Sequence, residues 1–456
     1  MSTTPAARTR PVPLPRTWGV RQLDVVALLA ANGVVILLMW LRHGGVDQLT
    51  TLGGALSAVG QVSALSGTYL ALIQLVLMGR SPWLDEAFGM DRLAWAHRWL
   101  GFATVWLIGF HVAFTVVGYA VADTKGVVDE IVLLLTTFRF VLWALVGFVL
   151  FLVIAVTSLR AARRRLPYEA WFWLHVGAYL AIAFAFLHQL FTGSDFMHDP
   201  VASVYWVAQY VVAIALIVAF RLGQPWLTSR RHRLRVAAVV PEAPGVASIY
   251  LTGYDLDRLP VRSGQYFVFR FLTRDQWWQG HPFSLSSAPN GSWLRITIKV
   301  LGDGSQRIIG LPVGTRVFVE GPYGVLTGAR RIRRQVTLIA GGIGIVPMRA
   351  LLESTAAAPG DLTLLYRASA PDDLVFRAEL DLIAAQRGAR VEYLVGRRAD
   401  LGRDPLGRES IRALVPDIAT HDVYLCGPDG MMTAVEAELR ALGVPRARLH
   451  AERFSY

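Results

Sequence analysis

Residues 94–118 read AWAHRWLGFATVWLIGFHVAFTVVG, and residues 171–191 read WFWLHVGAYLAIAFAFLHQLF. Each segment is apolar over the roughly 20 residues that an α-helix needs to cross the hydrocarbon core of a membrane. Each segment also contains two histidines. Because ionisable side chains are costly at membrane depth and usually serve a function there, we interpret both segments as membrane-spanning helices that carry a functional site.

Further apolar stretches flank these two segments, near residues 23–41, 56–78, 140–159 and 204–222. The hydrophobic fraction of the chain is 54%, above the range that is usual for soluble proteins. We therefore predict six membrane-spanning helices in a transmembrane domain at residues 21–228, after a cytoplasmic N-terminal segment at residues 1–20.

Arginine clusters indicate which side of the membrane each loop faces. They lie before the first span, after the fourth and after the sixth: Arg8, Arg10, Arg16 and Arg21; Arg160, Arg163, Arg164 and Arg165; Arg230, Arg231, Arg233 and Arg235. Because basic loops stay in the cytoplasm, we expect both termini in the cytoplasm. We expect the protein itself in the plasma (inner) membrane. The net charge of +12 follows from these clusters, so we do not expect a nucleic-acid partner.

This orientation makes the third and fifth spans parallel and pairs their histidines by depth. His97 and His175 lie towards the cytoplasm, and His111 and His188 lie about 21 Å further out along their helices. Imidazole is an axial haem ligand, and ligation by two histidines suits iron to electron transfer. We predict two bis-histidine haem b groups. Hydrogen bonds between helices, a transition-metal site and a proton pathway are the alternatives.

The histidine spacing in the fifth span is irregular. Fourteen residues separate His97 from His111, but thirteen separate His175 from His188. On an ideal helix the second spacing leaves the two side chains about 140° apart. We therefore expect either a local irregularity in the fifth helix or a histidine side chain that reaches around it.

After Arg235 the sequence changes to short β-rich runs, at residues 248–252, 266–271, 294–300 and 316–320. Glycine and proline turns separate them, which is typical of an antiparallel β-barrel. From residue 335 strands alternate with helices, which predicts a parallel nucleotide-binding sheet. The predicted fold is multidomain: a six-helix transmembrane bundle, an antiparallel β-barrel domain at residues 229–328 and an α/β parallel-sheet domain at residues 329–456.

A glycine-rich turn, Ala340-Gly341-Gly342-Ile343-Gly344-Ile345-Val346-Pro347, follows the first strand of the predicted parallel sheet. Glycines let backbone N–H groups approach a pyrophosphate, and the N-terminus of the next helix favours its charge. A tight structural turn is the alternative interpretation.

Further motifs occur in order along the chain: His281-Pro282-Phe283-Ser284, Gly302-Asp303-Gly304-Ser305, Gly321-Pro322-Tyr323-Gly324, Cys426-Gly427-Pro428 and Glu452-Arg453-Phe454-Ser455-Tyr456. After six spans with two histidine pairs, these motifs resemble the NADPH oxidase and ferric reductase family, whose soluble half is similar to ferredoxin–NADP reductases. The resemblance extends from about residue 20 to the end of the sequence. The spacings of 14 and 13 residues also match the haem ligands of that family.

The resemblance implies an FAD site in the β-barrel domain. His281, Pro282, Phe283 and Ser284 would line the flavin ring, with the Ser284 hydroxyl able to hydrogen-bond N5, the atom that accepts hydride. Lys299, Gly304 and Ser305 would hold the FAD diphosphate.

The resemblance also implies a site for NADPH or NADH in the α/β domain. Gly341, Gly342, Gly344 and Pro347 would hold its diphosphate, and Cys426, Gly427 and Pro428 would lie beside the nicotinamide. Phe454 would stack on the flavin, with Tyr456 as a rival, and Ser284, Cys426 and Phe454 are the expected catalytic residues. Arg367 follows a predicted strand, where a guanidinium can pair with a 2′-phosphate; an ordinary surface arginine is the alternative.

Together these features predict electron transfer from cytoplasmic NAD(P)H through FAD and two haems to an acceptor outside the cytoplasm. We expect dioxygen as the acceptor, giving superoxide. A ferric or cupric reductase is the alternative in the same enzyme class, and a metal or proton transporter with a nucleotide-sensing domain is the alternative from another class. The sequence has no extended tail for organising subunits, so we expect no obligatory protein subunit.

Overall fold

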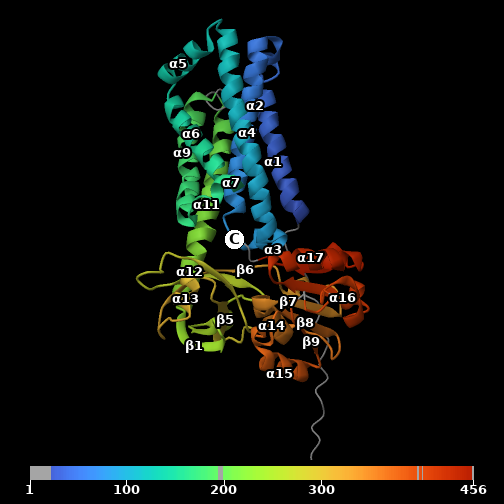
Figure 1. The fold of residues 1–456 in the computed structure, drawn as a ribbon. Coiled ribbons are helices and arrows are strands. Elements are labelled where there is room, and N and C mark those ends of the chain that lie inside the picture. Colours follow the sequence, from blue (N-terminus) through green and yellow to red (C-terminus); the bar gives the residue numbers. More distant parts are fainter. Residues whose placement is uncertain (1–21, 194–198, 398–399, 403, 454–456) are drawn as a thin grey trace, which may run out of the picture. The chain divides into compact units, whose positions relative to one another are not determined.

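The computed structural model describes residues 22–193, 199–397, 400–402 and 404–453 (Figure 1). The chain divides into two compact units. The membrane unit comprises residues 20–88 and 92–221, and the C-terminal unit is built mainly from residues 222–456.

Six helices of the described residues are long and apolar enough to cross a membrane, which confirms the predicted number of spans. They are α1 (Gln22–Arg42), α2 (Leu52–Leu77), α4 (Met90–Ala122), α6 (Val141–Ser158), α8 with α9 (Tyr168–Val176 and Ala178–Thr192) and α11 (Pro200–Ile217). A π-helical segment (Val218–Gly223) continues α11 into α12 (Gln224–His232).

The fifth span is interrupted at Gly177, between its two histidines. Helix α8 ends at Val176 and α9 begins at Ala178. The Gly177 amide donates to the carbonyls of both Trp173 (3.3 Å) and Leu174 (3.0 Å), so the helix tightens at this turn. The expected irregularity is present, and it lies where it can alter the relative directions of His175 and His188.

Glycines bring the histidine-bearing helices close to their neighbours. A Cβ atom on Gly53 of α2 would lie 2.9 Å from the Gly118 carbonyl oxygen of α4, and one on Gly147 of α6 would lie 2.9 Å from the Ala181 carbonyl oxygen of α9. Small residues of this kind permit close backbone packing in membranes. The backbones of α4 and α9 are therefore held against α2 and α6.

Shorter helices connect the spans, where the sequence predicted only loops. They are η1 (Asp47–Thr50), α3 (Pro82–Phe88), α5 (Val127–Thr137) and α7 (Arg160–Arg163).

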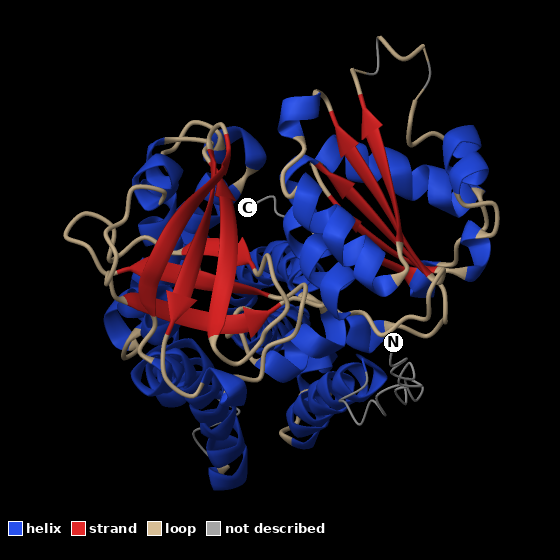
Figure 2. Cartoon of the chain, turned by 90° about the horizontal axis from the view of Figure 1, so that it is seen from below, coloured by secondary structure: helices blue, strands red, loops and turns tan. Residues whose placement is uncertain are grey.

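Two three-stranded antiparallel sheets form the first half of the C-terminal unit (Figure 2), which confirms the predicted antiparallel domain. Their orders are β1–β2–β5 and β4–β3–β6, with bounds β1 (Arg235–Ala243), β2 (Val246–Thr252), β3 (Tyr266–Phe271), β4 (His281–Ser284), β5 (Trp293–Lys299) and β6 (Val317–Tyr323). Alternate residues of a strand point to one face, and Phe267, Phe269 and Phe271 are all fully buried in the shared core. Helix α13 (Asp303–Ile308) follows β5.

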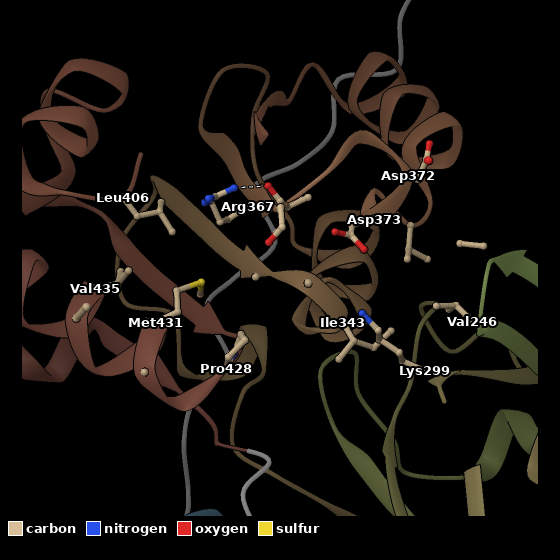
Figure 3. Close-up of a pocket in the computed structure, with 18 of the residues that line it drawn as sticks. Val246, Lys299, Ile343, Arg367, Asp372, Asp373, Leu406, Pro428, Met431 and Val435 are labelled. Carbon is tan, nitrogen blue, oxygen red and sulfur yellow. Dashed lines mark hydrogen bonds between the residues drawn. The ribbon is translucent and has the colours of Figure 1, made fainter. Parts of the chain in front are cut away.

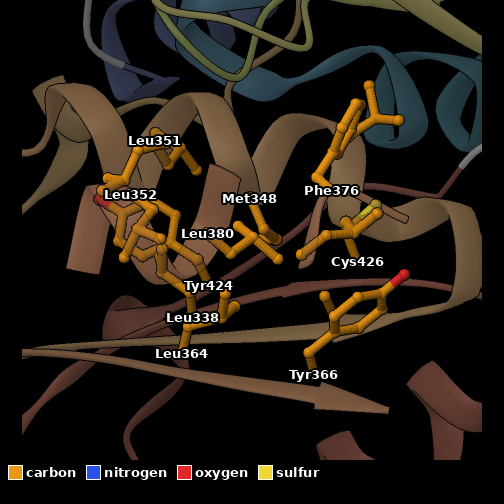
Figure 4. Packing of buried hydrophobic residues seen from close by; sticks show 14 of the residues in the cluster. Leu338, Met348, Leu351, Leu352, Leu364, Tyr366, Phe376, Leu380, Tyr424 and Cys426 are labelled. Atoms are coloured by element: carbon orange, nitrogen blue, oxygen red, sulfur yellow. The ribbon is translucent and has the colours of Figure 1, made fainter. Parts of the chain in front are cut away.

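A five-stranded parallel sheet forms the second half, also as predicted (Figure 2). Its order is β11–β10–β7–β8–β9, with bounds β7 (Val336–Gly341), β8 (Leu362–Ala368), β9 (Arg390–Val395), β10 (Asp422–Cys426) and β11 (Leu449–Ala451). The helices are α14 (Ile345–Ser354), α15 (Arg377–Arg387), α16 (Arg408–Leu414) and α17 (Asp429–Ala441). Leu338 of β7 packs with Met348 and Leu352 of α14 in one buried cluster (Figure 4). The strand order reverses beside β7, where sheets of this type bind ligands.

An ion-pair cluster around two buried arginines joins the two halves of the C-terminal unit. Arg295 of β5 donates two hydrogen bonds to Glu379 of α15, at 2.8 and 2.9 Å. Arg349 of α14 donates to the same carboxylate at 2.7 Å and to Glu353 at 2.5 Å. Glu353 also accepts from the Ala288 amide (2.7 Å), which follows β4. The cluster therefore fixes the orientation of the β-domain against the parallel-sheet domain.

Candidate functional site

The membrane unit brings the four predicted histidines together in the two expected pairs. The ring centroids of His97 and His175 are 5.9 Å apart, with the ring planes at 74°. Those of His111 and His188 are 6.4 Å apart, with the planes at 43°. The parallel course of α4 and the fifth span thus pairs the residues by depth.

The distances within both pairs fit a metal ion between two imidazoles. A metal–imidazole bond is about 2 Å long and the ring centroid lies about 1 Å beyond the nitrogen, so two opposed ligands place their centroids about 6 Å apart. Both observed distances, 5.9 and 6.4 Å, match this separation. The residues present therefore fit two haem groups, each with two histidine ligands.

Hydrogen bonds leave the ligand atom of an outer histidine available. Nδ1 of His111 lies 3.1 Å from the Gly60 carbonyl oxygen and 3.2 Å from the Thr115 hydroxyl. Because a carbonyl only accepts, Nδ1 carries the proton and Nε2 keeps the lone pair that a metal requires. Gly60 is needed here, since a Cβ atom at this position would meet the Thr115 hydroxyl.

A cavity of about 380 Å³ lies beside the outer pair, between α2, α4, α5, α6, α9 and α11. His111 and His188 line it, and the other described residues that line it include no Asp, Glu, Lys or Arg. Apolar side chains of α5, among them Ile131 and Leu134, form part of its wall. This cavity offers an apolar environment with a few hydroxyl and amide groups.

Gln189 is a residue of this region that the sequence reasoning missed. Its side-chain oxygen accepts from the Trp206 indole (2.8 Å) and the Tyr210 hydroxyl (2.9 Å), and its nitrogen donates to the Thr68 hydroxyl (3.2 Å). These bonds join α9 to α11 and α2 directly beside His188. An amide adjacent to a candidate ligand within an apolar span was the available signal.

The predicted flavin segment forms the edge strand β4, paired with β3. The Ser284 hydroxyl and Nε2 of His281 are buried and have no hydrogen-bond partner in the described part of the chain. Burial lowers the pKa of His281, and the Arg270 charge lowers it further, so the imidazole is neutral at pH 7. Buried polar atoms normally have partners, and these two therefore fit a bound polar ligand such as the flavin.

The predicted diphosphate segment of FAD lies close to this strand. A Cβ atom on Gly304 would lie 3.6 Å from the His281 ring. The Ser305 hydroxyl accepts from the amides of Leu301 (2.9 Å) and Gly302 (3.1 Å), so it stabilises the turn itself. Lys299 is exposed and lines a different cavity, described next.

A cavity of about 470 Å³ opens at the carboxyl ends of β7, β8 and β10, beside the reversal of strand order (Figure 3). Of the predicted residues it is lined by Lys299, Gly341, Gly342, Arg367 and Pro428. Gly342 has a φ of +52° and nothing within 4 Å of an added Cβ atom, so its backbone borders open space. This arrangement fits a nucleotide diphosphate at the start of α14.

Gly344, Pro347 and Gly427 do not line the cavity but shape the protein around it. A Cβ atom on Gly344 would lie 2.8 Å from the Gly427 amide, so glycine allows the turn after β7 to pack on the end of β10. Pro347 is buried within α14.

Cys426 is fully buried at the end of β10. Burial raises the pKa of its thiol well above the ordinary value, and the Glu452 carboxylate adds to the rise. The residue is therefore a neutral thiol at pH 7 and not a thiolate nucleophile.

Arg367 lines the cavity, but backbone carbonyls already engage its guanidinium. Nη1 donates to Leu394 (2.9 Å) and to Ala368. Three carboxylates that the sequence reasoning missed, Asp372, Asp373 and Asp404, also line the cavity. Phe454 and Tyr456, the two candidates for stacking on the flavin, lie outside the described residues.

Three family models match the chain in succession. Residues 63–186 match a ferric reductase like transmembrane component. Residues 247–327 match an FAD-binding domain, and residues 338–437 match an oxidoreductase NAD-binding domain.

Individual relatives resemble part of the chain. A flavohemoprotein of Vibrio cholerae is 35% identical over 182 residues, which are 38% of this chain and 45% of the relative. The glycine betaine monooxygenase reductase subunit of Chromohalobacter salexigens is 27% identical over 51% of this chain and 66% of its own length. The chain thus spans about half to two thirds of these relatives.

Among solved structures, the FAD/NAD-binding domain of a nitric oxide dioxygenase from Vibrio cholerae aligns with a TM-score of 0.41 and 26% identity, over 49% of this chain and 99% of that domain. The three successive family matches identify the chain as an NAD(P)H oxidoreductase with the architecture of the NADPH oxidase and ferric reductase family.

Proposed function

We propose that this protein moves electrons from cytoplasmic NAD(P)H across the membrane to dioxygen, which is reduced to superoxide. Its cofactors would be FAD in the C-terminal unit and two haems held by His97 with His175 and by His111 with His188. FAD accepts two electrons as hydride and releases them singly, and haem carries one electron at a time. Both termini would lie in the cytoplasm, with the outer pair facing the other side of the plasma (inner) membrane.

The observation that carries this proposal is the spacing of the histidine pairs. Both pairs show the separation of about 6 Å that two opposed imidazole ligands require. With FAD-binding and NAD-binding domains and two such pairs, the chain would have an electron donor site and a route across the bilayer in one polypeptide.

The lining of the outer cavity supports dioxygen as the acceptor. The described residues around it carry no formal charge apart from any on the histidines. A charged metal chelate would lose its hydration there without a charged partner, which is costly. Dioxygen is small and uncharged, so it can enter an apolar cavity without that cost.

A ferric or cupric reductase is the second candidate, favoured by the match of residues 63–186 to the ferric reductase like transmembrane component. Competition between dioxygen and ferric chelates for the reduced protein distinguishes the two. We expect air to reoxidise the protein faster than a ferric chelate does.

The decisive experiment is an optical spectrum of the purified full chain in detergent with FAD, under nitrogen, before and after NADPH or NADH is added, and then in air. Low-spin haem bands that are reduced by the nucleotide and reoxidised by air are the expected result. In a His188→Ala variant, flavin bleaching should persist while reoxidation through the outer haem is lost. Folded protein without haem bands would contradict the proposal and favour the transporter hypothesis.

No additional protein should be needed for this reaction. The purified chain is expected to turn over NAD(P)H with FAD alone, measured as oxygen consumption. Activity that requires a cytosolic extract would show that a partner subunit is obligatory.

A further inference from the structure

A stack of three side chains ends at the inner histidine pair. The Trp171 ring lies one helical turn before His175 on α8, with ring centroids 5.1 Å apart and planes at 23°. The guanidinium carbon of Arg163, from α7, lies 4.5 Å from the centre of the Trp171 ring. The order is therefore arginine, indole, imidazole.

Ser158, the last residue of α6, holds the edges of the same two rings. Its hydroxyl oxygen lies 3.4 Å from Nδ1 of His175 and accepts a hydrogen bond from the Trp171 indole, also at 3.4 Å. His175 is thus held on one face by an aromatic ring and at its Nδ1 edge by a hydroxyl. Groups that contact a metal ligand in this way set its orientation and basicity.

The two histidine pairs are oriented by different means. In the outer pair, His111 is fixed by a backbone carbonyl, that of Gly60. In the inner pair, His175 is fixed by the Trp171 stack, and its ring plane stands at 74° to that of His97. The orientation of a ligand ring therefore depends on the Trp171 side chain in the inner pair and on a backbone carbonyl in the outer pair.

We propose that Arg163 and Trp171 are positioning residues for the inner haem: Trp171 sets the plane of the His175 ligand, and the Arg163 charge raises the reduction potential of that haem. This proposal rests on the haem binding proposed above. A nearby positive charge favours the reduced form, because the added electron lowers the charge of the metal centre. Stacking on the indole holds the guanidinium in place.

Tryptophan and arginine are also common at membrane–water interfaces, where they anchor helices. An anchor would contribute to stability without acting on one haem in particular. The reduction potential of each haem therefore separates a positioning role from an anchoring role.

The experiment is an anaerobic redox titration of the full chain in lipid nanodiscs, followed by optical and paramagnetic resonance spectra. Arg163→Gln should lower the midpoint potential of one haem and leave that of the other unchanged. Arg163→Lys keeps the charge and should therefore keep the potential of that haem close to the wild-type value. Arg165→Gln is the matched control, because Arg165 is exposed in the same loop. It should move neither potential.

Trp171→Leu should shift the low-spin resonance signal of the same haem, whereas Trp171→Phe, which retains a ring, should change it less. A His175→Ala variant assigns the signals, since the haem that survives is the outer one. Equal shifts of both haems, or no shift with Arg163→Gln, would overturn the proposal. Wild-type protein without haem would instead refute the proposed function.

Discussion

Ser284 ends strand β4 with a buried hydroxyl that has no partner in the described part of the chain. Such an atom in a folded protein usually bonds a ligand or water. If it bonds flavin N5, the Ser284→Ala variant loses a bond that helps to place the hydride acceptor. We expect the rate of flavin reduction by NAD(P)H to fall about five- to tenfold, since one hydrogen bond contributes about 1 to 1.5 kcal/mol.

Stopped-flow bleaching of the flavin under nitrogen measures this rate. Ser284→Thr keeps the hydroxyl and is the control, expected to retain most of the activity. An unchanged rate in the alanine variant would remove Ser284 from the flavin site.

Asp422 is a charged residue of the parallel-sheet domain with three hydrogen-bond donors around it. It is fully buried at the start of β10. It accepts hydrogen bonds from Nε2 of His450 (3.0 Å) and the amides of Ile332 (2.8 Å) and Arg333 (2.5 Å). Burial would raise the pKa of Asp422, but these partners hold it below its ordinary value.

The lowered pKa predicts how stability depends on pH. A carboxyl group of this kind stabilises the fold above its unfolded pKa of about 4, and the contribution is lost as pH falls through the lower folded pKa. Asp422→Asn should cost about 2 kcal/mol at pH 7. Below pH 4 its melting temperature should converge on that of the wild type. Thermal unfolding of the full chain between pH 7 and 3 tests this, with exposed Asp400→Asn as the control.

At the scale of elements, the cluster around Glu379 joins β5 to α14 and α15. Arg295 is 2% exposed and Arg349 is 7% exposed, so removing their shared carboxylate leaves two buried guanidinium groups without that partner. The Glu379→Ala variant should therefore lose about 2 kcal/mol or more of stability. It should also loosen the β-domain against the parallel sheet.

Chemical denaturation of the full chain measures the first effect, and limited proteolysis between the two domains measures the second. Glu392→Ala is the matched control, since it breaks an ion pair with Arg390 whose partners are 38% and 49% exposed. Such a surface pair contributes at most about 1 kcal/mol. Equal losses in both variants would show that the cluster is no stronger than a surface pair.

The elements show what the sequence could and could not predict. Hydropathy alone located the six spans, because lipid requires about 20 apolar residues in each. Alternation and glycine turns likewise indicated both sheets. Helix α5 was missed because its charged first turn, with Asp129 and Glu130, resembles a loop. The break at Gly177 was expected only as an irregularity, since the helix arithmetic gives an angle but no position.

The candidate site likewise contains some residues that the sequence could predict and others that it could not. The histidine pairs and the glycine turn could be predicted from the sequence because their spacing follows local geometry. The surroundings of His175 could not be predicted, since Ser158 reaches His175 and Arg163 reaches Trp171 only when α6, α7 and α8 pack together. The engagement of Arg367 by the Leu394 carbonyl similarly depends on the pairing of β8 with β9.

At the scale of the whole molecule, the membrane unit is built with its polar contacts inside. Span α2 is 56% buried in its most apolar window, against 6–22% for the other spans, so it is the central helix. The amide and hydroxyl bonds of Gln61, Thr68 and Gln74 all lie on it. Large apolar side chains cover much of the outside of the spans, and electrons on the histidine pairs would therefore cross a medium of low dielectric constant.

Electron transfer through such a unit should respond to the membrane potential. Each electron that crosses 100 mV against the field costs about 2.3 kcal/mol. In proteoliposomes supplied with external NAD(P)H, electrons delivered to the lumen build a negative potential that slows their own transfer. Addition of valinomycin with potassium should dissipate this potential and increase oxygen consumption. External ferricyanide, which takes electrons directly from the flavin, is the control and should give a rate that valinomycin does not change. If valinomycin leaves oxygen consumption unaltered as well, the electrons leave on the side where they entered, and the two histidine pairs are not a transmembrane path.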